Sequence, residues 1–116
     1  MVAKQNLEIY QGSDFQKVLE FKDESSVLMD LTGYILRGQA RSNYSAGDIA
    51  FSFDFTLRDQ TVSPGLVDMI VTSASTSAVS IAKASEYLYD MELVSGTGIV
   101  RRFLEGKVKL FPEVTK

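Results

Sequence analysis

Arg37 and Arg41 are the first residues of the chain whose types and spacing point to chemistry. Side chains two and four residues apart share one face of a β-strand, so Arg37, Gln39 and Arg41 would face the same way. Two guanidinium groups on one face could bind an anion. The alternative is the solvent-facing side of an antiparallel strand, where polar and apolar residues commonly alternate. Because such alternation runs through 35–41, we favour the strand face over an anion site.

A run of small residues at 73–84 contains four serines, an arrangement that could supply a nucleophile. A serine nucleophile needs a neighbouring base, however, and the chain offers no histidine and no lysine at a recognised spacing. We therefore expect a loop whose hydroxyl groups cap backbone groups. This is also the one place where a short helical turn is expected.

The motif Ser95-Gly96-Thr97-Gly98 partly matches the glycine-rich loops that bind dinucleotide phosphates. Those loops require a third glycine that opens a helix after a strand. Here a second extended, apolar-rich segment follows instead. The motif therefore predicts a hairpin turn and not a phosphate site.

The chain contains neither histidine nor cysteine. This excludes Ser-His and Cys-His nucleophiles, histidine-ligated metals, thiolate chemistry and disulfides. Carboxylate chemistry remains, but the acidic residues are scattered singly, whereas an oxygen-ligated calcium ion usually needs several in one loop. We therefore predict no catalytic residue, no metal site and no cofactor, and a protein that is not an enzyme.

Length and charge indicate a single domain over 1–116, with short tails at about 1–5 and 112–116. The formal net charge is −3 and no run of Lys or Arg could neutralise successive phosphates, so nucleic acid is not an expected partner. Met1 to Gln5 lacks the apolar core of a signal peptide. No run approaches the roughly 18 apolar residues of a membrane span, so we expect a soluble protein and no membrane partner.

Alternation of apolar and polar residues predicts an all-β protein. The segment from Tyr87 to Val94 has the period of a half-buried strand; after the turn, an extended segment broken at Glu105-Gly106 runs to Phe111. Further segments with a strand signature lie at 7–10, 15–21, 35–41, 49–57 and 66–72. Seven or eight short strands, each with one apolar face, favour an antiparallel two-sheet sandwich over a barrel.

Phe51, Phe53 and Phe55 recur on one face of the predicted strand at 49–57. A stacking platform for nucleic-acid bases is one interpretation of such a stripe. Those platforms sit among basic residues, however, and the neighbours here include Asp54 and Asp59. We therefore predict that the three phenylalanines anchor the core.

Five short motifs follow one another along the chain in a characteristic order. They are 11–15 (QGSDF), 30–34 (DLTGY, leading to Arg37 and Arg41), 89–93 (YDMEL), 104–108 (LEGKV) and 112–115 (PEVT). This order resembles a widespread group of small structural proteins of tailed-phage virions, which are immunoglobulin-like or related β-sandwich modules of baseplate, neck and fibre components. The resemblance spans most of the chain.

The resemblance implies an immunoglobulin-like sandwich with a non-enzymatic, structural role. It also implies a location in the virion, after assembly in the host cytoplasm. The partners it implies are other virion structural proteins of the tail, baseplate, neck or capsid, with further copies of the same chain as another option.

The two ends of the chain are the candidate docking surface for such partners. Edge strands are normally protected by charge, proline or bulges, but 7–10 carries only Glu8, and the segment after Lys109 contains Leu110, Phe111 and Pro112 beside Val114. We hypothesise docking by strand addition or along a partner's surface; the alternative is that both strands pair within the domain. The candidate docking residues are Leu7, Ile9, Tyr10, Phe111, Pro112 and Val114.

An adhesive or carbohydrate-binding β-sandwich is the second function that the sequence supports. Tyrosine rings can stack on sugars when several are exposed in one concave patch with polar neighbours. The tyrosines available for this are Tyr10, Tyr34, Tyr44, Tyr87 and Tyr89.

Overall fold

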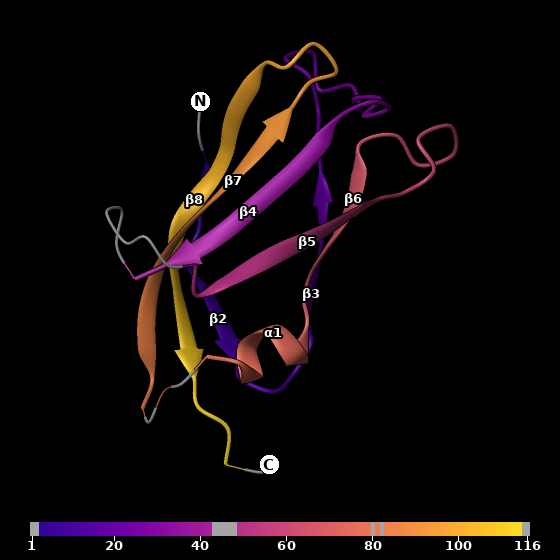
Figure 1. The fold of residues 1–116 in the computed structure, drawn as a ribbon. Coiled ribbons are helices and arrows are strands. Elements are labelled where there is room, and N and C mark those ends of the chain that lie inside the picture. The colour runs from indigo at the N-terminus through magenta and orange to yellow at the C-terminus, as the bar shows by residue number, and fades with distance from the viewer. Residues whose placement is uncertain (1–2, 43–48, 80, 82, 115–116) are drawn as a thin grey trace.

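The computed structural model describes residues 3–42, 49–79, 81 and 83–114, and Figure 1 shows their arrangement. In chain order the elements are β1 (Ala3–Lys4), β2 (Leu7–Tyr10), β3 (Phe15–Glu20), β4 (Ile35–Arg41), β5 (Phe51–Leu57), β6 (Leu66–Val71), α1 (Ser73–Ser77), β7 (Ser85–Val94) and β8 (Val100–Phe111). The prediction of an all-β protein is confirmed. In the described part of the chain, no helix is long and apolar enough to cross a membrane.

The strands form one curled, mixed sheet. Their hydrogen-bonded order is β1-β8-β7-β4-β5-β6-β3, and β2 pairs with β8 as well. β1 and β2 run parallel to β8, one after the other along its length, while the remaining pairs are antiparallel. The first and last segments of the chain therefore form one edge of the sheet.

The sheet turns at β5, because this strand changes partner halfway along. Residues 51–53 pair with β4, whereas residues 54–57 pair with β6 on the other side of the strand. The part of the sheet made by β6 and β3 can thereby face the part made by β2, β8, β7 and β4 (Figure 1).

The prediction of an antiparallel, immunoglobulin-like sandwich of two separate sheets was wrong. Hydrogen bonds connect the strands in a single path, and two of the pairings are parallel. The physical reason for the error is that both architectures give each strand one apolar face and one polar face. Period-two alternation shows which residues point inward but not which strands are neighbours.

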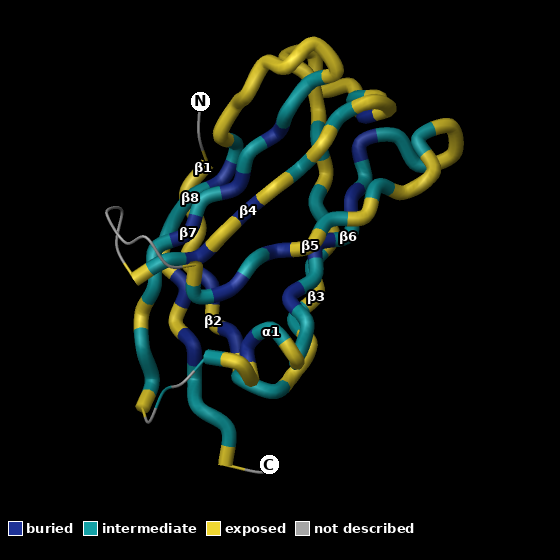
Figure 2. The backbone as a smooth tube through the Cα atoms, in the orientation of Figure 1, coloured by how far each residue is buried: buried dark blue, intermediate teal, exposed yellow. Residues whose placement is uncertain are grey.

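The inner faces of the curled sheet enclose the core, seen as the dark blue segments in Figure 2. Phe51 and Phe53 are each 4% exposed, and Phe55 packs against the same cluster while half-buried. This confirms the predicted role of the phenylalanine stripe. The apolar side chains with no exposed surface are Ile9, Leu31, Ala40, Val67, Met69, Val71, Met91, Val108 and Leu110.

The predicted break at Glu105-Gly106 was also wrong, because β8 runs through both residues without interruption. The glycine serves a close approach of two backbones. The connection between β1 and β2 crosses over this point, and a Cβ atom on Gly106 would fall on the carbonyl oxygen of Gln5. The amide of Gln5 also donates to the Glu105 carbonyl at 3.0 Å.

Gln11 holds the corner between β2 and β3. Its side-chain amide donates to the carbonyls of Thr76 at 3.0 Å and Val79 at 2.6 Å, and its Oε1 accepts from the amide of Glu113 at 3.3 Å. The backbone amide of Gln11 donates to the Phe111 carbonyl at 2.9 Å. One side chain thus ties the β2–β3 turn to the segment that follows β6 and to the C-terminal segment.

Tyr89 links β7 to the N-terminal segment and predicts a pH dependence. Its hydroxyl donates to the Gln5 carbonyl at 2.6 Å, and burial raises the pKa of Tyr89 to about 12 because the phenolate would lose contact with water. Folding therefore favours the protonated form. Its contribution to stability is complete below the ordinary pKa of about 10 and disappears as the pH rises through about 12.

We expect the melting temperature of the wild type to fall more steeply between pH 9 and 12 than that of Tyr89→Phe, which has no phenol to ionise at this position. Thermal melts followed by circular dichroism would measure both slopes. Parallel slopes would contradict the proposed contribution of Tyr89.

Candidate functional site

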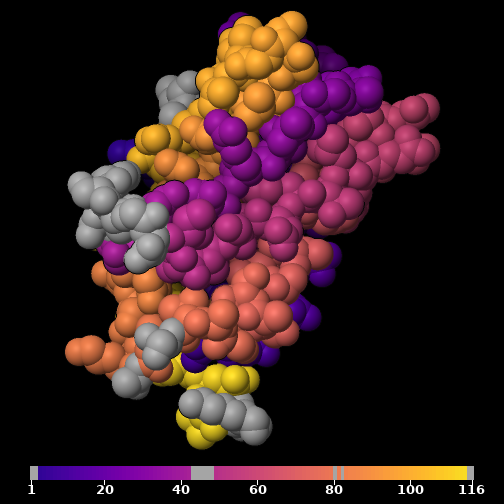
Figure 3. Space-filling view, viewed as in Figure 1, coloured from indigo at the N-terminus to yellow at the C-terminus, as the bar shows by residue number. Residues whose placement is uncertain are grey.

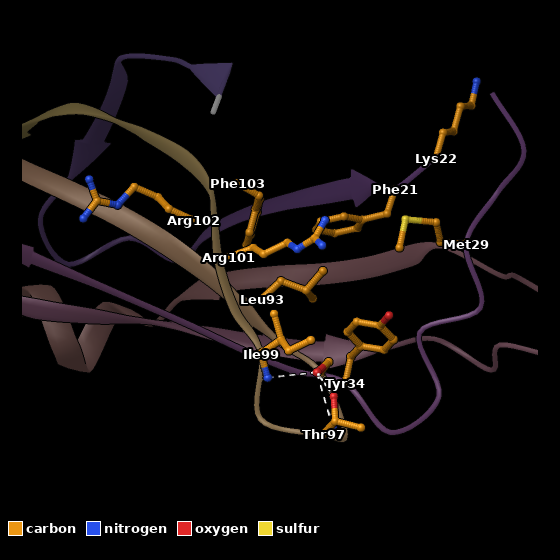
Figure 4. A pocket seen from close by; sticks show the side chains of 11 residues that line it. Phe21, Lys22, Met29, Tyr34, Leu93, Thr97, Ile99, Arg101, Arg102 and Phe103 are labelled. Carbon is orange, nitrogen blue, oxygen red and sulfur yellow. Dashed lines mark hydrogen bonds between the residues drawn. The ribbon is translucent and has the colours of Figure 1, made fainter. Parts of the chain in front are cut away.

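A hollow of about 750 Å³ lies at the end of the sheet that carries the β7–β8 turn. We call it the end groove. Figure 4 shows its side chains, which come from the segment between β3 and β4 and from both arms of the β7–β8 hairpin. The lining residues are Phe21, Lys22, Met29, Tyr34, Leu93, Ser95, Thr97, Ile99, Arg101, Arg102 and Phe103.

The floor of the end groove is apolar and continuous with the core. Leu93 is 8% exposed and belongs to a small buried cluster, against which Phe21, Met29, Tyr34 and Phe103 pack. The rings of Phe21 and Phe103 meet edge to face, with their centroids 4.9 Å apart and their planes at 68°. A floor held by packing of this kind is preformed for an apolar ligand group.

A β-bulge aims Phe103 at this floor. Leu104 lies opposite Met91 and Arg102 lies opposite Glu92, so Phe103 is an extra residue in β8. Bulges bend a strand and redirect side chains. Because of this extra residue, Phe103 and the two arginines before it do not follow the two-residue alternation of the rest of β8.

The turn at the rim is held closed by its own hydroxyl groups. Ser95 Oγ accepts from the amides of Ile99 at 3.0 Å and Thr97 at 3.3 Å, and it lies 3.0 Å from the Thr97 hydroxyl. The Ser95 amide donates to the Ile99 carbonyl at 2.9 Å. The prediction of a hairpin turn at 95–98 is confirmed, and these hydroxyls are already engaged within the turn.

Three basic residues line the end groove, and Arg101 is the one without an ion pair in the part of the chain that the structure describes. Lys22 pairs with Glu20 at 3.3 Å, and Arg102 pairs with Asp90 at 3.2 Å. In Figure 4 the Arg101 side chain extends toward Phe21, while Arg102 points away from it. Since no carboxylate lines the groove, its charge favours an anionic group at Arg101.

A shallower hollow of about 380 Å³ lies where β4 and β5 separate. β4 pairs with β5 only over residues 38–40, so among the described residues Ile35 to Arg37 have β7 on one side and no strand on the other. Tyr34 borders both this hollow and the end groove. The two hollows therefore meet at Tyr34, and the second lies along an open strand edge.

Arg37 and Arg41 lie on the strand face that we favoured for them. Arg37 Nε is 2.7 Å from a carboxylate oxygen of Glu92 on the neighbouring strand β7. Arg41 donates to the side-chain oxygen of Gln39 at 3.0 Å. A cross-strand pair of this kind satisfies the guanidinium group of Arg37 without an external anion.

The serine-rich run forms a capped helical turn, as predicted. α1 begins after Thr72, whose Oγ1 accepts from the Ser75 amide at 3.2 Å, as an N-cap does. The Ser73 amide donates to Asp14 at 2.7 Å. Residues 80 and 82 lie outside the described part of the chain. Within that part, no three residues of the types His, Cys, Asp and Glu group together as a metal site would need.

The six predicted docking residues divide into core and surface. Leu7 is 6% exposed and Ile9 is fully buried, on the strand that pairs alongside β8. The other four gather where β2 and β8 end, and we call them the terminal patch: Tyr10, Phe111, Pro112 and Val114.

Within the terminal patch, the rings of Tyr10 and Phe111 stack with centroids 5.0 Å apart. Lys109 Nζ lies 5.4 Å from the centre of the Phe111 ring. Tyr10 is 59% exposed and Val114 is 96% exposed. Figure 3 shows the C-terminal residues projecting from the end of the molecule, below the segment that carries α1.

The tyrosines do not form one patch. Tyr10 belongs to the terminal patch, Tyr34 lines the end groove, Tyr89 is buried and Tyr87 is half-buried against the core. Tyr44 lies outside the described residues.

No protein-family model matches the sequence, and a search of curated proteins found no match. Two solved structures align with 96% of the chain: a sialyltransferase from Photobacterium damsela (8% identity, TM-score 0.40) and a 2,6-sialyltransferase from Photobacterium sp. JT-ISH-224 in a ternary complex with CMP and lactose (14% identity, TM-score 0.30). The chain spans 18% of the length of each. Likeness at this level supports no conclusion about fold or function.

The sequence analysis did not predict the end groove. Its floor combines Phe21 and Met29, on either side of a loop, with Leu93 and Phe103 from the distant hairpin. Alternation along 87–94 did place Leu93 on the inner face. No local pattern, however, indicates that the segment between β3 and β4 packs next to the β7–β8 hairpin. Nor does it indicate that Arg101 has no ion pair there among the described residues.

Proposed function

We propose that this chain is a non-enzymatic structural protein of a tailed-phage virion, an all-β module that docks on other tail, baseplate, neck or capsid proteins. The order of motifs from Gln11 to Thr115 supports the choice of a virion protein. The observation that supports docking is the terminal patch, where exposed apolar side chains from both ends of the chain gather on one surface.

Only some of the predicted docking residues are accessible to a partner. Leu7 and Ile9 are buried within the domain, so a partner would meet the residues that alternate with them and those beyond β8. Tyr10 and Phe111 are already stacked, so little side-chain entropy would be lost when a partner covers them. Aromatic anchors of this kind commonly dominate interface energies.

The β7–β8 turn, which borders the end groove, lies at the opposite end of the molecule from the C-terminal end of β8, which carries the terminal patch (Figure 1); the molecule is 45 Å long. A module with a contact surface at each end can link two neighbours in an assembly. This arrangement supports a bridging position between virion subunits.

The proposal predicts that Val114→Asp lowers incorporation into phage particles roughly tenfold or more, because a charge would be buried in the docked interface. The melting temperature of the purified domain should stay within a few degrees of the wild type, since Val114 is 96% exposed. Quantitative immunoblots of purified particles would measure incorporation.

Val62→Asp is the matched control, because Val62 is also exposed, at 77%, and lies in the β5–β6 connection away from the terminal patch. Equal incorporation of both variants would reject docking through the terminal patch. Absence of the wild-type chain from purified particles would reject the virion function itself.

An adhesive or carbohydrate-binding module is the second candidate. The observation that favours it is that Tyr34 lines the same concave surface as Phe21 and Phe103. Glycan-array binding that is lost in Tyr34→Ala, with particle association absent, would favour this function over the virion role.

A further inference from the structure

We propose that the end groove binds an extended segment of a partner protein that alternates acidic and apolar residues, with a carboxylate on Arg101 and an apolar side chain on the floor below it. The proposal names the chemistry of a partner that the virion function leaves open. It rests on that function only in taking the partner to be a protein.

Charge is the first argument. Lys22 and Arg102 already have carboxylate partners, whereas Arg101 has none among the described residues and projects over an apolar floor (Figure 4). A guanidinium group beside an apolar surface makes its strongest hydrogen bonds to a carboxylate, which it can bind in a bidentate manner. The ligand therefore carries an acid at this point.

The apolar floor is the second argument. Phe21, Met29 and Leu93 form an apolar surface that packs against the core. The unbranched thioether of Met29 can adapt to ligand side chains of different shapes. Ile99 stands at the rim and is 56% exposed. Such a surface fits an aliphatic or aromatic side chain next to the acid.

The shape of the surface favours a peptide over a sugar. Sugars stack on open aromatic faces, but Phe21 and Phe103 meet edge to face, and the hydroxyls of Ser95 and Thr97 are engaged in their own turn. An extended peptide, by contrast, can use an open strand edge. Past Tyr34 the neighbouring hollow is lined by Ile35 and Leu36, which lack a strand neighbour on the β5 side among the described residues.

The test uses a short synthetic peptide in which aspartate alternates with leucine and phenylalanine, titrated into the full ¹⁵N-labelled chain and followed by NMR. The control peptide carries asparagine in place of every aspartate. We expect chemical-shift changes at the end groove, including Tyr34, Ile99 and Arg101, and an affinity that falls with added NaCl because the ion pair is screened. The neutral peptide should bind at least tenfold more weakly.

Arg101→Gln should lower the affinity for the acidic peptide roughly tenfold or more, and Ile99→Ser should lower the affinity for both peptides. Lys107→Gln is the matched control: it removes one positive charge from an exposed position on the same strand, away from the groove, and should leave the affinity unchanged. All these positions are exposed, and spectra of the free variants would verify that each remains folded.

The proposal is overturned if the peptides do not bind, if both peptides bind equally, if the shifts lie outside the groove, or if Arg101→Gln and Lys107→Gln behave alike. If a uronic-acid oligosaccharide binds and neither peptide does, the proposal is overturned in favour of a glycan site. Particle association tests the virion function separately. If the chain is found in particles but does not bind the peptide, the virion function stands and the groove proposal fails. If the chain binds the peptide but is absent from particles, the groove proposal stands and the virion function fails.

Discussion

Replacing Phe53 with alanine is expected to lower the free energy of unfolding by about 3–5 kcal/mol, a large part of the margin of a small domain. Phe53 is 4% exposed at the point where β5 changes partner. Its ring centroid lies 5.7 Å from that of Phe51 and 5.4 Å from that of Tyr89. Gly38 on β4 leaves space for the ring, which sits where a Cβ at position 38 would come within 3.2 Å.

The loss should be large because the cavity would open between elements that cannot easily collapse. Backbone pairing holds β4 and β5 at this register, so the space left by the ring stays partly empty. Urea unfolding followed by circular dichroism would measure the effect. Val18→Ala, at a valine that is 47% exposed on β3, should change stability by only about 0.5 kcal/mol. Similar losses in both variants would mean that Phe53 is not a core anchor.

Replacing Gly106 with alanine is expected to cost about 3 kcal/mol, at the upper end of typical overpacking penalties. The new methyl group would meet a backbone atom, the carbonyl oxygen of Gln5, and not a side chain that could turn away. Relief requires the β1–β2 connection to lift from β8. That movement would disturb two hydrogen bonds: the one from the Tyr89 hydroxyl to the Gln5 carbonyl and the one from the Gln5 amide to the Glu105 carbonyl.

Gly96→Ala is the matched control, because its Cβ would find only ordinary contact, 3.7 Å from the Gly33 carbonyl oxygen. It should stay within about 0.5 kcal/mol of the wild type. Amide hydrogen exchange would locate the damage in Gly106→Ala, where the amide of Gln5 should lose protection. Full protection of that amide, or equal stability of the two glycine variants, would contradict the close approach.

The same contact bears on the terminal patch. Leu7, Ile9 and Tyr10 follow directly after Gln5, and their pairing with β8 sets which of them face the core and which face outward. A shift of the connection in Gly106→Ala would therefore disturb the surface formed by Tyr10 and Phe111. Val114→Asp changes that surface without touching the fold, so the two variants separate a docking defect from a folding defect.

Local patterns in the sequence were sufficient for the positions of most strands and for the facing of their side chains, but not for β1 or for the continuity of β8. Period-two alternation placed Phe51 and Phe53 inward, because successive side chains in any strand point to opposite faces. Glycine and short polar residues marked the 95–98 turn, and small hydroxyl residues marked the helical turn at 73–77. These features depend on neighbours within a few residues, which the sequence displays directly.

Tertiary structure alone decided how the strands assemble. The parallel pairing of β2 with β8 joins residues about a hundred positions apart, and the division of β5 between β4 and β6 depends on where each partner lies in space. The continuity of β8 through Gly106 likewise depends on a distant backbone, that of Gln5. Alternation is identical in a sandwich and in a curled sheet, so no local pattern distinguishes them.

The candidate site follows the same division. The residue types alone exclude histidine and cysteine chemistry, and they place apolar residues near both chain ends. Leu7 and Ile9 are buried while Tyr10 is exposed, and Arg101, unpaired among the described residues, lines the same groove as Phe21, only because of the fold. The physical reason is that residue types limit the available chemistry, whereas a binding surface is made by side chains that meet only when distant strands and loops pack together.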